Sequence, residues 1–211
     1  LPIYLTVDPQ KIRALTYQSA HLGHLVKTED KVHITIYDDN KLDVFVGDDV
    51  QNFSIKSPGD VILYGVLSVD ALLEITCKNL DISAYKFDFT DGSQVTDLST
   101  SIKAGAAIFC VQEELSLQAH CDFSQLDLSA KCLQYSGDTT TVSGAIIVDS
   151  ITLIERSSFE VSDTLALSAR LMTIEETASL KANTLRGRIE NLLQDGDIDI
   201  KNFSLKVEDY M

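Results

Sequence analysis

The sequence predicts an all-β protein, a right-handed parallel β-helix with three sides and about 20 residues per turn over roughly eight turns. Two observations predict this fold. Apolar residues recur at steps of 19 or 20 positions along most of the chain, and they alternate with polar residues inside each repeat. A fixed period of this length is typical of solenoids, in which each repeat buries its apolar side chains against its neighbours. An N-terminal β-hairpin cap is expected to precede the repeats.

Three columns of apolar residues carry the period. Each column has eight members, and all 24 positions are apolar, although only 45% of the chain is hydrophobic. The first column is Ile55, Ile75, Val95, Leu115, Tyr135, Ile154, Ile174 and Leu193. The second is Ile62, Ile82, Ile102, Phe123, Val142, Val161, Leu180 and Ile200. The third is Leu67, Phe87, Ala106, Leu126, Ile146, Leu165, Leu185 and Leu205.

The third column has a companion two residues further along the chain, and this spacing indicates strands, because alternate side chains of a strand share one face. Within one repeat the columns lie about 7, 5 and 8 residues apart, which predicts three short strands joined by corners. We therefore expect Leu126, Ile146 and Leu165 to touch in a continuous interior stack. Right-handed coiling follows from the general rule for parallel crossovers.

An α-helical alternative fits residues 101–119 and 171–194, which contain good helix formers. A helix would not keep phase with the β-branched stretch "TTTVSGAIIVDSITL" between these segments. The unbroken columns favour strands throughout.

A second repeated feature is an aliphatic residue followed, two positions later, by alanine. The small residue would let a strand bend at a corner without overfilling a narrow core. The motif occurs at 82–84, 102–104, 117–119, 128–130, 167–169 and 180–182.

In repeat length and in this motif, the chain resembles the haemagglutination repeats of the filamentous haemagglutinin family of bacterial adhesins. The segments "LSLQAHCDFSQLDLSAKCLQ" and "LALSARLMTIEETASLKANTL" look like such repeats. The resemblance covers about residues 55 to 207. It implies an adhesin or effector-like protein that is secreted or exposed on a cell surface, and it transfers no active-site motif.

Residues 1–52 fit the period less well. The segment "KVHITIYDDNKLDVFVGDD" contains two alternating stretches around a polar turn at Asp38 to Lys41, which predicts an antiparallel hairpin. Because the open end of a solenoid needs covering, we expect residues 1–52 to form a cap and residues 53–211 to form the β-helix. The columns continue to Val207 without a second cap, so we expect a fragment of a longer chain.

The net charge of the chain limits the classes of partner that it can bind. The chain carries 17 basic and 32 acidic side chains, a formal net charge of −15, which disfavours nucleic acid and anionic membrane surfaces. No apolar run approaches the roughly 20 residues that cross a bilayer, so no membrane insertion is expected. Cys77, Cys110, Cys121 and Cys132 lack zinc-site spacing, and unpaired thiols favour a reducing compartment.

No metal, cofactor or catalytic residue is expected. His21 and His24 have no third ligand at a supporting spacing, and the acidic clusters at 37–40, 47–49, 88–92 and 194–200 lack the pattern of a calcium loop. A polar column accompanies the second apolar one and is interpreted as a solvated face. Its members are Asp81, Ser101, Asp122, Thr141, Glu160, Ser179 and Asp199.

Arg170, Arg186 and Arg188 form the only basic cluster. Two interpretations stay open: these side chains pair with Glu175, Glu176 and Glu190 on adjacent turns, or they form a docking patch for an anionic partner.

A solenoid adds regular strand surface with every turn rather than building a pocket. The sequence therefore predicts a non-enzymatic binding or structural segment of a bacterial surface, secreted or host-directed protein, which presents a strand face to a protein or glycan. Two alternatives are a carbohydrate-active β-helix enzyme and a self-assembling cytoplasmic scaffold that associates end to end.

Overall fold

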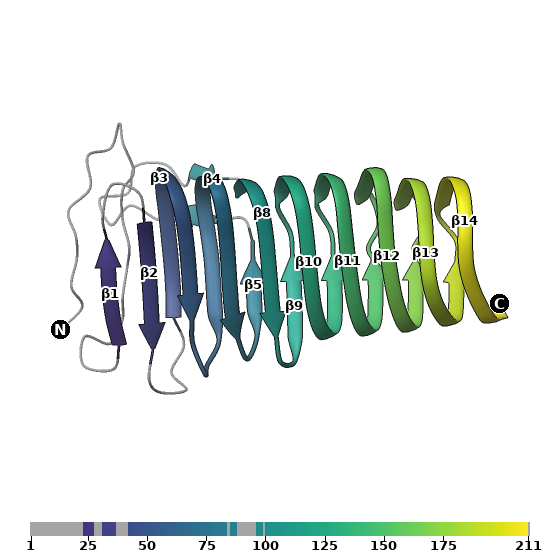
Figure 1. Ribbon diagram of the computed structural model, residues 1–211, viewed down its shortest axis with the longest axis horizontal. Coiled ribbons are helices and arrows are strands. Elements are labelled where there is room, and N and C mark those ends of the chain that lie inside the picture. Colours follow the sequence, from purple (N-terminus) through teal and green to yellow (C-terminus); the bar gives the residue numbers. More distant parts are fainter. Residues whose placement is uncertain are drawn as a thin grey trace.

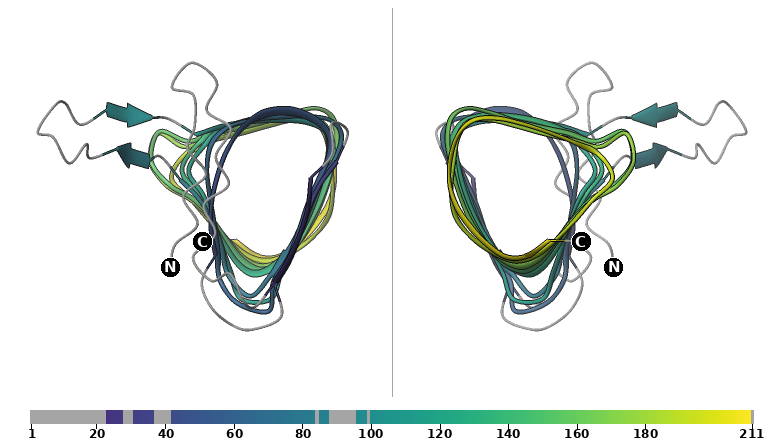
Figure 2. Two further views of the ribbon diagram at one scale, coloured as in Figure 1. Left: turned by 90° about the vertical axis from the view of Figure 1, so that its left-hand side faces the viewer. Right: turned by 90° about the vertical axis from the view of Figure 1, so that its right-hand side faces the viewer.

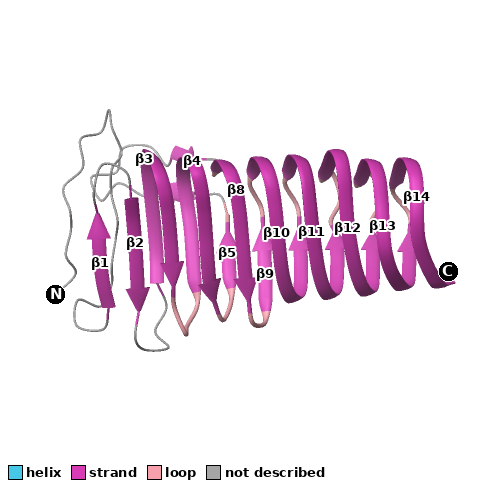
Figure 3. Ribbon diagram, in the orientation of Figure 1, coloured by secondary structure: helices cyan, strands magenta, loops and turns pink. Residues whose placement is uncertain are grey.

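The computed structural model of the 211-residue chain describes residues 23–27, 31–36, 42–83, 85–87, 96–98 and 100–210. These residues form 14 strands and no helix (Figure 3). The strands are β1 (Gly23–Lys27), β2 (Lys31–Ile36), β3 (Leu42–Lys56), β4 (Val61–Cys77), β5 (Leu80–Ile82), β6 (Tyr85–Phe87), β7 (Thr96–Leu98), β8 (Ser101–Val111), β9 (Glu114–Leu117), β10 (His120–Tyr135), β11 (Asp138–Leu153), β12 (Ser158–Ile174), β13 (Ser179–Gln194) and β14 (Asp197–Tyr210).

The parallel strands stack into a β-solenoid of about seven turns of roughly 20 residues, which confirms the predicted fold (Figure 1). Seen along its axis, the solenoid has a three-sided outline (Figure 2). The helical alternative is excluded, because residues 101–111 and 179–194 lie on β8 and β13.

In the later turns one strand runs round all three sides. In β10 the ladder to β11 is interrupted at Ser124 and Lys131, where the chain turns corners. We call residues 120–123, 125–130 and 132–135 of β10, with the residues stacked on them, the first, second and third sides. The expected three short strands per turn are therefore joined through the corners.

The predicted register is partly wrong. Ile55 pairs with Ile75, and Leu165 with Leu185, as expected. The stack of Leu126, Ile146 and Leu165 does not form: Leu126 and Leu165 lie on either side of Gly144, and Ile146 pairs with Leu128 and Leu167. The reason is that stacked residues are 18 apart between β10 and β11 but 20 or 21 apart between β11 and β12.

Turn length accounts for this variation. Two residues, Ser136 and Gly137, connect β10 to β11, whereas four residues, 154–157, connect β11 to β12. A register shift between Thr141 and Gly144 adds one more residue.

The predicted hairpin at 31–49 is also wrong. β2 pairs with β3 in parallel, Lys31 opposite Asn52. The antiparallel pair at this end lies one strand earlier, between β1 and β2, where Gly23 is opposite Ile36. β3 already stacks in parallel on β4 from Leu42 onward, so the solenoid ladder begins inside the expected cap; the predicted turn at 38–41 lies outside the described residues.

One turn carries an insertion. Leu67 of β4 pairs with Ile102 of β8, a step of 35 residues, and between them β6 and β7 form an antiparallel pair that projects from the solenoid (Figure 2). Phe87 therefore pairs with Thr96 rather than joining the third column, and Val95 lies outside the described residues.

The interior is filled by the inward rows of the three sides. The alanine motif contributes to this interior: Ile102 with Ala104, Leu167 with Ala169, and Leu180 with Ala182 are all buried, whereas Ala130 is only partly buried and Ala84 lies outside the described residues. Edge-to-face aromatic pairs also pack in this interior, with ring centroids 5.3 Å apart for Tyr135 and Phe159 and 6.2 Å apart for Phe109 and Phe123. The Tyr135 hydroxyl donates a hydrogen bond to the Ser158 carbonyl at 2.7 Å, so this buried polar group is satisfied. No helix in the described part of the chain is long and apolar enough to cross a membrane.

Candidate functional site

The three predicted arginines lie on neighbouring turns of one region. Arg186 and Arg188 point outward from the second side on β13, because Leu185 and Ile189 alternate with them and are buried. Arg170 lies on β12 at the corner between the second and third sides, and it lines the same hollow as Arg188. Arg170 and Arg188 therefore share one hollow, whereas Arg186 lies on the second side and does not line that hollow.

Arg188 pairs with Glu190, Nη2 to Oε1 at 3.5 Å, but both residues lie on β13 rather than on adjacent turns as predicted. Arg170 pairs instead with Asp149, Nη2 to Oδ2 at 3.1 Å. Glu175 accepts a hydrogen bond from the backbone N–H of Glu155 at 3.1 Å, and Glu176 is an exposed turn residue.

A ladder of alternating charge follows this corner. Lys131 Nζ lies 2.7 Å from Glu113 Oε2, and the next two turns contribute the pair of Asp149 and Arg170. Exposed ion pairs of this kind contribute about 0–1 kcal/mol each. These ion pairs therefore add little stability, but they hold the long side chains in place along the corner.

The ladder borders a hollow of about 280 Å³. Ile147 lines this hollow and is 63% exposed. The residues stacked on either side of Ile147 are Ser129 and Ser168. The second side therefore presents an apolar centre with arginines along one border, and sequence reasoning found the arginines but missed Ile147 and Asp149.

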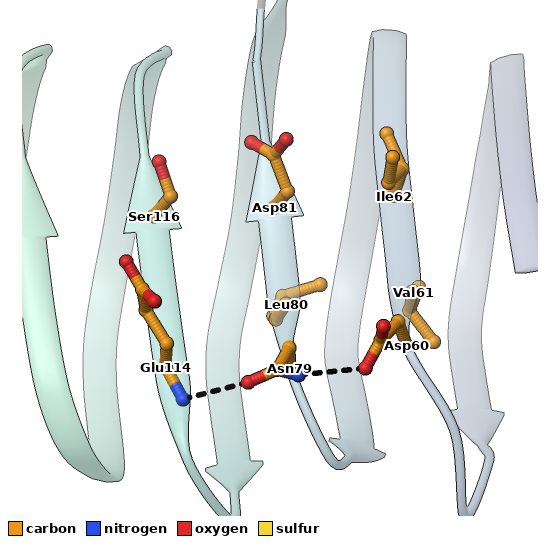
Figure 4. Close-up of a pocket in the computed structure, with 8 residues that line it drawn as sticks. All are labelled: Asp60, Val61, Ile62, Asn79, Leu80, Asp81, Glu114 and Ser116. Atoms are coloured by element: carbon orange, nitrogen blue, oxygen red, sulfur yellow. Dashed lines mark hydrogen bonds between the residues drawn. The ribbon is translucent and has the colours of Figure 1, made fainter. Parts of the chain in front are cut away.

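A second hollow, of about 330 Å³, lies on the third side where β4, β5 and β9 meet (Figure 4). It contains three carboxylates, on Asp60, Asp81 and Glu114. Asn79 connects two of the strands: its Nδ2 donates to Asp60 Oδ1 at 2.7 Å, and its Oδ1 accepts from the Glu114 backbone N–H at 3.1 Å.

Sequence reasoning missed this hollow because the insertion separates Asp81 from Glu114 by 33 residues along the chain. The Asp91-Gly92 dipeptide, a hairpin turn signal, was the available indication that an insertion interrupts the period.

The predicted polar column divides among four rows. Asp122, Glu160 and Asp199 share one outward row of the first side with Lys103, Thr140 and Lys181. Ser101 and Ser179 belong to the neighbouring row, Thr141 is buried, and Asp81 lies on the third side. Lys103 and Asp122 approach to 3.9 Å, so the shared row mixes both signs of charge.

The remaining sequence candidates are dispersed where the structure describes them. His21 and the clusters at 37–40 and 88–92 lie outside the described residues, and His24 lies on β1. The cluster at 47–49 lies on β3, and the one at 194–200 runs from the end of β13 into β14. Among the residues that the structure describes, no three His, Cys, Asp or Glu side chains gather as metal ligands would.

The four cysteines are free. Burial raises the pKa of the Cys77 thiol to about 12, with a smaller contribution from Asp60. Burial likewise raises the pKa of Cys121 to about 12, whereas Cys110 is exposed. The two buried thiols are therefore protonated at neutral pH and unsuited to nucleophilic chemistry.

Comparison with known proteins gives no match to a family model, to a curated protein or to a solved structure. The resemblance to haemagglutination repeats stays a prediction.

Proposed function

We propose that this chain is a non-enzymatic binding segment that presents the second side of its solenoid to a partner, as part of a bacterial surface, secreted or host-directed protein. The observation that carries the proposal is the surface around Ile147, an exposed apolar side chain bordered by Arg170 and Arg188. A regular strand ladder holds these groups on a rigid frame, which lowers the entropic cost of binding. Protein and glycan partners with anionic groups fit the arginines.

Binding to defined anionic probes tests this proposal. Immobilised full-length chain is titrated with poly-L-glutamate and with heparin, and the same titration is made with an Arg186→Glu/Arg188→Glu variant. We expect the variant to lose at least about tenfold in affinity, since each arginine contact to an anion is worth about 1 kcal/mol or more. The matched control is Lys103→Glu/Lys181→Glu on the first side, which changes the net charge equally and should retain binding. Equal loss in both variants, or no binding by the wild type, contradicts the proposal.

A carbohydrate-active enzyme is the second candidate, and the hollow with Asp60, Asp81 and Glu114 favours it. Paired carboxylates serve as acid and base in glycoside cleavage. The test is release of new reducing ends from polygalacturonate, hyaluronate and arabinoxylan by the wild type, compared with Asp81→Asn and Glu114→Gln. Activity that both variants lose would replace the binding proposal.

A self-assembling scaffold is the third candidate. Phe203 of β14 pairs with the buried Leu185 in an inward row, yet this residue is 61% exposed, because no strand of the described chain stacks beyond β14. End-to-end association would cover it. An Ile200→Lys or Phe203→Lys change should then abolish polymerisation, measured by light scattering.

A further inference from the structure

The outward residues of the second side change in charge along the solenoid. One row, formed by residues paired from β10 to β13, contains Asp127, Ala145, Ala166 and Arg186 in that order. The row is therefore acidic at one end, uncharged over two turns and basic at the other end.

A second outward row lies two residues further along each strand. It contains Ser129, Ile147, Ser168 and Arg188. Its centre is Ile147, and covering an exposed isoleucine with another protein surface is favourable by about 25 cal/mol per Å² of apolar area. The second side thus combines an apolar centre with opposite charges at its two ends.

We propose that the second side binds the second side of another copy of this chain, with the two solenoid axes antiparallel. A two-fold axis that runs along the strand direction between β11 and β12 places Asp127 opposite Arg186 of the partner subunit, and the same contact forms a second time by symmetry. The uncharged rows then meet at the centre, with Ile147 opposite Ser168 of the partner subunit. This inference rests on the proposed function, since it names the partner of the same surface.

The side chains that would pair are available in a single copy. Arg186 has the uncharged residues Ala166 and Ser204 as its register neighbours, and no ion pair to it forms among the described residues. Asp127 accepts one hydrogen bond, from Gln125 Nε2 at 2.8 Å, through a single carboxylate oxygen.

Charge also selects the orientation. With parallel solenoid axes, Asp127 would face Asp127 of the partner subunit, and Arg186 would face Arg186 of the partner subunit. Like charges at an interface disfavour association. The antiparallel arrangement converts both contacts into attractive ones.

The area of the second side allows a weak dimer. The side is six residues wide, from 125 to 130 in β10, or about 20 Å at about 3.4 Å per residue. Six turns spaced by about 4.8 Å extend about 29 Å, which gives roughly 1,150 Å² of total buried surface. Specific interfaces begin near 1,000–1,200 Å², so association in the micromolar range is expected.

The net charge of −15 does not prevent this association. At about 0.15 M salt, charges more than about 8 Å apart are largely screened, so the local contacts decide. Because the proposed contacts are ion pairs near the two ends of the interface, the dimer should weaken as salt rises.

A mixing experiment on the full chain tests the proposal by sedimentation velocity. The Asp127→Lys variant places a positive charge opposite Arg186 of the partner subunit. The Arg186→Glu/Arg188→Glu variant places a negative charge opposite Asp127 of the partner subunit. Each variant alone should therefore be monomeric. An equimolar mixture should form a heterodimer, because both contacts become attractive again. The wild type should dimerise at up to about 200 μM, a range that detects micromolar Kd values. First-side controls with the same charge changes, Glu160→Lys and Lys103→Glu/Lys181→Glu, should dimerise like the wild type.

Three results would overturn the proposal: a monomeric wild type over this range, variants that dimerise alone, or a mixture that remains monomeric. Probe binding separates this failure from failure of the proposed function. A monomeric wild type whose heparin binding still depends on Arg186 and Arg188 assigns the surface to an anionic partner, whereas loss of both dimer and probe binding refutes both proposals.

Discussion

The Thr100 hydroxyl donates a hydrogen bond to the carbonyl oxygen of Ser83, 17 residues earlier in the chain, and so closes the base of the insertion that carries β6 and β7. The same hydroxyl accepts a hydrogen bond from the Gly65 backbone N–H at 3.2 Å. Thr100 is 1% exposed. Ser83 and Thr100 lie where the consecutive residues Gln118 and Ala119 lie in the next turn. The backbone hydrogen bonds show this stacking: the Gln118 N–H donates to the Ile82 carbonyl, and the His120 N–H donates to the Thr100 carbonyl.

Removing residues 84–99 should therefore leave an uninterrupted solenoid. The deletion takes 16 residues from the 35-residue step between Leu67 and Ile102 and leaves 19, the step between Ile102 and Cys121. We expect a retained β-type circular dichroism spectrum, cooperative unfolding and a Tm within about 5 °C of the wild type. Deleting 83–100 instead leaves a step of 17, and this matched control should lower the Tm strongly. Loss of cooperative unfolding in the first variant would contradict the assignment of the insertion.

The Thr100 hydroxyl itself can be tested without changing the chain length. Thr100→Val keeps the side-chain shape but leaves the Gly65 N–H and the Ser83 carbonyl without this partner. Buried unsatisfied groups cost about 1–3 kcal/mol, so the free energy of unfolding in urea should fall by that amount. Thr100→Ser retains the hydroxyl and should lose clearly less. A Thr100→Val variant as stable as the wild type, beside a destabilised Thr100→Ser, would mean that packing of the methyl group, and not hydrogen bonding, holds the insertion.

The sequence predicts the architecture well, since burial of alternate side chains and a regular repeat are properties of composition and spacing. It predicts the register poorly, because turn length depends on contacts between turns. Gly137 permits the two-residue turn between β10 and β11, where a Cβ atom would approach the Ala119 carbonyl oxygen to 2.1 Å. A constant step of 20 stacks Arg170 on Ser150, whereas the observed step places it beside Asp149.

The candidate site was likewise predicted only in part from the sequence. Strand alternation predicts that Arg186 and Arg188 point outward together. Placing Asp127 in the same row as Arg186, and Ile147 on a turn between them, requires the observed register. A constant period does not give that register, because the number of residues per turn varies. The hollow at Asp81 and Glu114 could be predicted only by recognising that an insertion separates these two residues in the sequence.

Two backbone positions should respond in opposite directions to substitution. Gly187 has φ 134°, and a Cβ atom there would lie 1.9 Å from the Leu167 carbonyl oxygen, so Gly187→Ala should destabilise the solenoid. Arg156 adopts φ 66° in the turn between β11 and β12, a conformation that costs a non-glycine residue about 1–2 kcal/mol. Since glycine loses more entropy on folding, Arg156→Gly should gain only about 0.5–1 kcal/mol. Urea unfolding measures both. A stabilising Gly187→Ala would refute the stacking of Gly187 on Leu167.

The buried thiols predict how stability depends on alkaline pH. Burial raises the pKa of both Cys77 and Cys121 from 9.0 to about 12, so above pH 9 the unfolded chain releases protons that the folded chain retains. Because the unfolded state then binds fewer protons, the free energy of unfolding should fall as pH rises from about 9 towards 12, by up to about 1.4 kcal/mol per pH unit for each thiol. Below pH 9 both states hold these protons, and the thiols add no slope.

Urea unfolding at pH 8, 9 and 10 measures this slope, with Cys77→Ala/Cys121→Ala as the comparison. The double variant will be less stable overall, but its stability should depend less on pH between 9 and 10. Thiol labelling gives an independent check: at pH 8 the exposed Cys110 should react within minutes, whereas Cys77 and Cys121 should react only when the chain unfolds. Rapid native-state labelling of either buried thiol, or an unchanged pH slope in the double variant, would mean that water reaches the interior beside β4 and β10.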